Sequence, residues 1–211
     1  MKTLLSFSAA ALLALALASP AAPYCDTTTP CIFPPGPCAY LGSEPVTFTN
    51  GAVLNYLDFE NSIDCDALPP VGGSTNQLIT STIVLRLANG GPPALYGGSA
   101  TLTMHLFGDP GVNPREIALE LLALDFQFIS LPAGTRLRES PTLPSSGHAT
   151  ITESPPGQYH IDSFFDVFFE LSTDSGQSWF PASGPLRTVL SPAAPLPARP
   201  STWGAVKATY R

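Results

Sequence analysis

Short runs of β-branched and aromatic residues, separated by turn-forming Gly, Pro, Asn and Asp, most constrain what this chain can fold into. The runs begin at about residue 46. They predict strands over Val46–Thr49, Leu78–Leu87, Ala100–Phe107, Ile117–Ile129, Thr135–Arg138, Ala149–Thr152, Tyr159–Leu171 and Leu186–Leu190. Regular strands with little helix are typical of an antiparallel sandwich or barrel. We predict an all-β domain over residues 46–190, an antiparallel β-sandwich of the Ig-like or jelly-roll-like kind.

Composition supports a folded domain. Hydrophobic residues make up 44% of the chain and charged residues only 12%, so there is apolar material for a core. One segment, Glu116–Leu124, is rich in Ala, Glu and Leu and favours helix by propensity alone. We assign it to a strand because it continues into the alternating sequence Asp125-Phe126-Gln127-Phe128.

The run from Asp162 to Leu171 indicates which of its faces is buried. One face is apolar and predicts core: Phe165, Val167, Phe169 and Leu171. The other face carries Phe164 and Phe168 among carboxylates, a pattern that could bind a carbohydrate or a protein partner. A second layer or a long loop covering both rings is the plainer interpretation.

The N-terminus predicts export. Residues 1–18 contain Lys2, an apolar run and the small-x-small site Ala16-Leu17-Ala18, as in a cleaved signal peptide. The apolar run is shorter than the roughly 20 residues of a membrane-spanning helix, and no later stretch could form one. We expect a secreted or cell-surface protein, with the periplasm as an alternative.

Four early cysteines agree with an oxidising compartment: Cys25, Cys31, Cys38 and Cys65. An even number in an exported chain predicts two disulfides, for which three pairings exist. They would staple the Pro- and Cys-rich segment of residues 19–45. A metal site is the alternative, but the spacings contain no CxxC pair.

The acidic balance excludes one class of partner. The net charge is -7, which repels phosphate backbones, so nucleic-acid binding is not expected. Carboxylates near Cys65 could hold calcium: Asp58, Glu60, Asp64 and Asp66. The spacing and glycine of an EF-hand are missing, and a solvated acidic loop is the plainer account. No other cofactor is predicted.

The end of the chain differs from its body. Residues 191–200 predict a Pro-rich linker, and residues 201–211 an aromatic and basic tag. All 16 acidic residues precede the tag. Its candidate docking residues are Trp203, Lys207, Tyr210 and Arg211, and in a helix Trp203, Val206 and Tyr210 would share a face. A frayed terminus without contacts is the alternative.

The segment from Ser172 to Trp179 matches the Asp-box pattern, Ser/Thr-x-Asp-x-Gly-x-x-Trp, at Ser172, Asp174, Gly176 and Trp179. The resemblance implies a structural hairpin after Leu171, because Asp174 can accept bonds from turn N–H groups and Gly176 can take positive φ. A propeller would need several copies, and the chain has one.

A longer stretch, Leu137 to Trp179, contains LRESPTLPSSG followed by DSFFDVF. It resembles an uncharacterised family of secreted bacterial β proteins. The resemblance implies an extracellular β fold and carries no catalytic residue.

Catalytic motifs are missing from the sequence, including HExxH, Gly-x-Ser-x-Gly and P-loop patterns. We therefore expect a non-enzymatic structural or interaction module with a protein or glycan partner at the cell surface. Self-association through edge strands is a further expectation. A carbohydrate-binding module using Phe164, Phe168 or Tyr96 is one alternative, and a secreted hydrolase is another.

Overall fold

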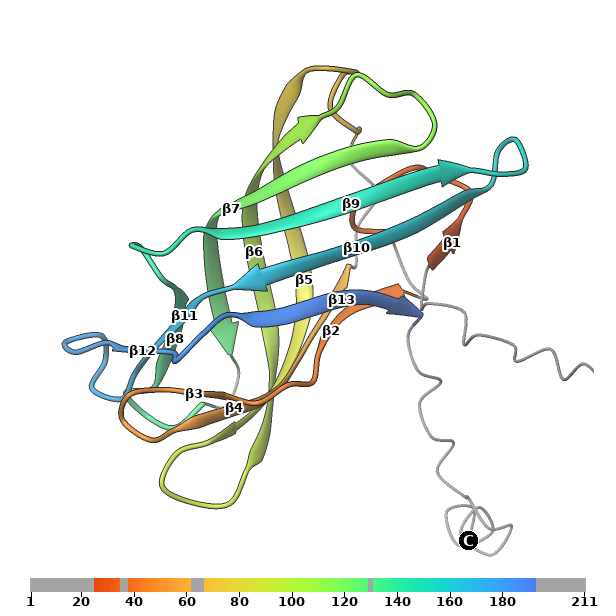
Figure 1. Cartoon of the computed structure of the whole chain (residues 1–211). Coiled ribbons are helices and arrows are strands. Elements are labelled where there is room, and N and C mark those ends of the chain that lie inside the picture. Colours follow the sequence, from red (N-terminus) through yellow and green to blue (C-terminus); the bar gives the residue numbers. More distant parts are fainter. Residues whose placement is uncertain (1–24, 35–37, 62–66, 129–130, 193–211) are drawn as a thin grey trace, which may run out of the picture.

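The structure is a computed structural model that describes residues 25–34, 38–61, 67–128 and 131–192 (Figure 1). The predicted signal peptide and C-terminal tag lie outside these residues, so both stay predictions. The described residues form thirteen strands and no helix: β1 (Cys25–Thr27), β2 (Cys38–Gly42), β3 (Val46–Thr47), β4 (Val53–Asn61), β5 (Ser74–Ala88), β6 (Ala94–Gly108), β7 (Arg115–Phe128), β8 (Arg136–Glu139), β9 (Ser145–Glu153), β10 (Tyr159–Val167), β11 (Phe169–Ser172), β12 (Phe180–Pro181) and β13 (Leu186–Pro192).

The main sheet closes into a barrel. Hydrogen bonding runs through β10, β13, β2, β4, β5, β6, β7 and β9, and β9 pairs in turn with β10. The prediction of an all-β antiparallel fold is confirmed, but this ring is not the pair of separate sheets of a sandwich. The physical reason is that β9 pairs with β7 on one side and β10 on the other, which leaves no open edge between two layers.

Two predicted boundaries also differ. The first barrel strand, β2, comes from the Pro- and Cys-rich segment that we placed outside the β domain. At the other end β13 continues to Pro192, into the predicted linker, because Ser191 and Pro192 pair with β2.

The segment Glu116–Leu124, whose composition favours helix, is part of a strand. β7 pairs with β6 along its length, so the helical alternative for Glu116–Leu124 is wrong. The pairing contains a β-bulge: Met104 lies opposite Leu121 and Thr103 opposite Ala123, which leaves Leu122 as an extra residue. Ile117, Leu119 and Leu121 are buried before it and Leu124 after it, so the bulge shifts the inward positions from odd to even numbers.

The barrel is filled with side chains. Phe33, Tyr40 and Phe165 form an aromatic cluster with ring centroids 4.5 to 5.7 Å apart, and a cavity that they line has a volume of about 10 Å³. The Tyr40 hydroxyl lies 2.8 Å from the Ile32 carbonyl oxygen and 2.8 Å from the Ser163 hydroxyl. Burial raises the pKa of Tyr40 well above its usual range. The interior is therefore packed around Phe33 and the Ile32 carbonyl oxygen.

Cys25 and Cys38 form a disulfide that connects β1 to β2. Cys31 is disulfide-bonded as well. Cys65 lies outside the described residues. The observed bond selects, from the three pairings left open by the sequence, the one that contains Cys25–Cys38.

A smaller sheet of β12, β11 and β8 stands beside the barrel. The sequence predicts one strand over Tyr159–Leu171, but the chain leaves the ladder at Phe168 and continues as β11. Phe168 donates its backbone N–H to the Ser145 Oγ and accepts a bond from the Ser140 N–H on its carbonyl. These two bonds redirect the strand from the barrel to the smaller sheet.

Candidate binding groove

A groove separates β7 from β8. β7 pairs with β9 only as far as Leu121, and after the bulge it pairs with β6 alone. β8 pairs with β11 alone. Within the described part of the chain, each strand therefore has an edge without ladder partners.

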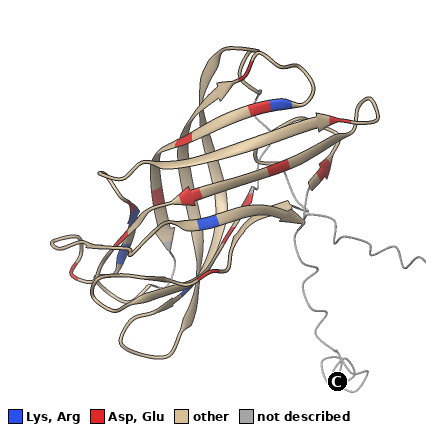
Figure 2. Cartoon of the chain, viewed as in Figure 1, with Lys and Arg blue, Asp and Glu red and all other residues tan. Residues whose placement is uncertain are grey.

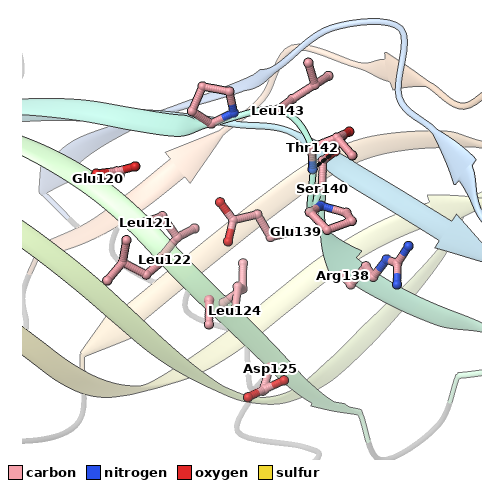
Figure 3. A pocket seen from close by; sticks show the side chains of 13 residues that line it. Glu120, Leu121, Leu122, Leu124, Asp125, Arg138, Glu139, Ser140, Thr142 and Leu143 are labelled. Carbon is pink, nitrogen blue, oxygen red and sulfur yellow. Dashed lines mark hydrogen bonds between the residues drawn. The ribbon is translucent and has the colours of Figure 1, made fainter.

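Two open clefts lie along this gap, with volumes of about 490 and 540 Å³. Both are lined by Leu124, Asp125 and Arg138, so they meet. Figure 3 shows the first cleft, in which the Glu139 side chain lies between β7 and the segment that follows β8. Leu122 and Leu143, which are 49% and 43% exposed, give this cleft apolar surface.

Glu139 is the titratable group most affected by the groove. Burial, partly opposed by a hydrogen bond with Ser145 and reinforced by the nearby charge of Glu120, raises the pKa of Glu139 to about 7. Glu120 and Asp125 line the same cleft. The first cleft therefore presents three carboxyl groups, one of which titrates near neutral pH.

Arg138 does not neutralise these carboxylates, because it is bound to another one. Its Nε and a terminal nitrogen donate to the Glu170 Oε2 at 2.9 and 2.6 Å. Glu170 is 8% exposed and also accepts a bond from the Ser140 hydroxyl. The Arg138 guanidinium lies 3.8 Å from the centroid of the Trp179 ring.

The four Asp-box-like residues form the turn between β11 and β12, where Leu171 pairs with Phe180. Ser172 donates its hydroxyl to Asp174 and accepts the Gly176 N–H, and Asp174 accepts the Ser178 N–H at 2.9 Å. The bonds from Ser178 and Ser172 lower the pKa of Asp174 to about 2. Gly176 has a φ of +92°. These contacts are local and structural, and Trp179 connects the turn to the groove as a lining residue of the second cleft.

The two predicted ligand-face aromatics do not join this site. Phe164 is half-buried, and the Arg187 guanidinium lies 4.1 Å from its ring centroid. Arg187 is held there by a bidentate pair with Asp166, at 2.9 and 2.7 Å. Phe168 is half-buried where the chain leaves the barrel, and Tyr96 is half-buried against the core.

The calcium candidates are only partly described. Asp58 and Glu60 lie on β4, while Asp64 and Asp66 lie outside the described residues. Asp58 Oδ2 accepts a bond from the Tyr56 hydroxyl at 3.1 Å, and burial raises the pKa of Asp58. No group of three or more His, Cys, Asp or Glu in the described ranges is placed to hold a metal ion.

Sequence reasoning missed the groove residues Glu120, Leu122, Asp125, Glu139 and Leu143. One signal was present: the run Leu121-Leu122-Ala123-Leu124 breaks the alternation of β7 where the bulge falls. Figure 2 shows where the arginines and carboxylates of the described chain lie, and β8 carries Arg136 and Arg138.

The fold and the groove define an all-β, disulfide-bonded barrel protein with an open site on its outside. No protein-family model, curated protein or solved structure matches this chain. Among the residues that the structure describes, no helix is long and apolar enough to cross a membrane.

Proposed function

We propose that the protein is a non-enzymatic extracellular interaction module that binds an extended segment of a partner polypeptide between β7 and β8. The observation that carries this proposal is the pair of strand edges without ladder partners, one on each side of the groove. An extended segment can add to such an edge, with main-chain hydrogen bonds supplying affinity and side-chain contacts supplying specificity. The Cys25–Cys38 disulfide supports an extracellular location.

The volumes of the cavities favour a binding site on the outside of the barrel over one in its interior. The aromatic-lined cavity in the barrel is about 10 Å³, less than a small ligand needs. The two clefts at the groove are each about fifty times larger. Leu122 and Leu143 offer apolar contacts there, and carboxylates line its rim.

A photo-cross-linking experiment tests the proposal. p-Benzoylphenylalanine replaces Leu122 in the exported chain, and the matched control carries it at Leu78, a 67% exposed leucine on β5. We expect polypeptide adducts from position 122 and none from position 78. Equal adducts from both positions, or none from position 122, would refute a binding groove here.

A hydrolase is the second candidate, because one observation favours it. Glu139, with a pKa of about 7, lies in a cleft that Glu120 also lines, and a carboxyl group with a pKa near neutral can serve in general acid and base catalysis. Fluorogenic glycosides and esters test this reading across pH 4 to 9. Turnover that Glu139→Gln abolishes would replace the binding proposal, whereas no turnover leaves the binding module as the better account.

The carbohydrate-binding alternative draws less support. Its main aromatic, Phe164, has Arg187 over its ring, and the same arginine is fixed by two bonds to Asp166. A sugar could not stack on that face of Phe164 without displacing Arg187.

A further inference from the structure

We propose that the partner segment is the C-terminal segment of a second copy, residues 205–211, so that copies join head to tail. This inference rests on the proposed function, because it names the occupant of the same groove. Three observations carry it: the charge of the groove, the pattern of the terminal segment, and the position at which the described chain ends.

The charges of the first cleft and of the terminal segment are complementary. Glu120, Asp125 and Glu139 line the first cleft, while the guanidinium of Arg138 is bound to Glu170. The last acidic residue of the chain is Asp174, so the terminal segment is purely basic, with Lys207 and Arg211. Attraction between them would steer association and weaken with salt.

The terminal segment has the alternation of a strand that is apolar on one face. In extended form, one side carries Val206, Ala208 and Tyr210, and the other Lys207, Thr209 and Arg211. Along the groove, the exposed side chains of Leu122 and Leu143 lie in the same cleft as the carboxylates. A strand between β7 and β8 would place its apolar side toward the leucines and its basic side toward the rim.

The position of the end of β13 favours binding of the terminal segment to the groove of another molecule. β13 starts with Leu186 beside Val167, next to the smaller sheet, and ends with Pro192 beside Cys38. Figure 1 shows this end on the opposite side of the molecule from β8. Residues 193–204 are rich in proline, and at roughly 3.1 Å per residue they could extend about 37 Å beyond Pro192. The described chain thus ends on the side of the molecule away from its own groove.

The contact between copies is heterologous, because the terminal segment of one copy binds the groove of the next and the two surfaces differ. Such contacts build open chains of molecules rather than a closed dimer. The average mass in solution should then rise with concentration and fall with added salt.

The test uses full exported chains with charge-reversed surfaces. The groove variant carries Glu120→Lys and Asp125→Lys, the tail variant carries Lys207→Glu and Arg211→Glu, and the control carries Asp109→Lys in an exposed turn. Sedimentation should show concentration-dependent association for the natural chain and the control. Each of the other variants alone should associate at least tenfold more weakly.

Mixing the groove and tail variants distinguishes the loss of a specific contact from misfolding of the variants. The mixture should form dimers, because the natural tail of the groove variant meets the natural groove of the tail variant. A free peptide, WGAVKATYR, should dissociate the natural chain, and its Lys207→Glu, Arg211→Glu counterpart should not. A monomeric natural chain, or assembly that neither variant weakens, overturns the terminal segment as occupant. Cross-links from position 122 to a different polypeptide would also refute the terminal segment as the occupant, but they would support the binding groove. The absence of any cross-links from position 122 would refute both the occupant and the groove.

Discussion

Replacing Glu139 by glutamine should stabilise the protein at alkaline pH and leave its stability at acid pH unchanged. Burial raises the pKa of the Glu139 carboxyl from 4.5 to about 7. Between these values the folded protein holds a proton that the unfolded chain releases, so the free energy of unfolding falls as pH rises through this window. Glutamine is neutral at every pH and can still bond with Ser145, so the variant lacks this loss.

The size of the effect follows from the two pKa values. A difference from 4.5 to about 7 corresponds, without screening, to about 3 kcal/mol. Glu139 is only half-buried, so solvent screening reduces this to about 1–2 kcal/mol. For a domain of this size, that corresponds to a rise in Tm of roughly 3–6 °C at pH 8.

Urea unfolding followed by tryptophan fluorescence at pH 4, 6 and 8 measures the difference between the natural chain and Glu139→Gln. The difference should be near zero at pH 4 and grow with pH. Asp125→Asn, at an exposed carboxylate of the same groove, is the control for loss of a charge. A variant that is less stable than the natural chain at pH 8, or a difference that does not change with pH, would refute the reasoning.

Three further changes test the packing. Removing the disulfide with Cys25→Ser and Cys38→Ser should cost about 3 kcal/mol in guanidinium unfolding, because its ends are 13 residues apart; a loss below about 1 kcal/mol would contradict this. Gly147→Ala would place a Cβ in a steric clash with the Phe164 carbonyl oxygen, so we expect the free energy of unfolding to fall by about 3 kcal/mol or more, and a normal Tm would exclude the strand pairing there. Arg138→Ala leaves buried Glu170 without its ion pair and should cost about 3 kcal/mol at pH 7, whereas an unchanged urea midpoint would mean that water replaces the arginine.

Strands and turns followed from local sequence, since alternation and turn residues act over a few positions. The interior face of Tyr159–Leu171 is an example: Phe165, Val167, Phe169 and Leu171 are all buried. β7 was identified by its final alternating residues, although its first half favours helix by propensity. Pairing with β6 on one side and β9 on the other overrides that propensity.

Closure of the sheet could not be predicted in this way. It depends on β9 pairing with both β7 and β10, and on β2, a short strand from a segment dominated by Pro and Cys, joining β13 to β4. The pairing of β13 with β2 joins residues about 150 positions apart, for which a single sequence carries no local signal.

The groove depends on one extra residue. Up to Leu121 the strand β7 is held between β6 and β9, and the insertion of Leu122 bends it and reverses which residues face inward. The strand then leaves β9 while keeping its pairing with β6, so its second edge opens beside β8. Because Phe33 and its neighbours fill the barrel, the strand cannot close the gap by moving into the interior. A filled barrel with a bulged strand therefore presents its binding surface on the outside, where an added strand can pair with an exposed edge.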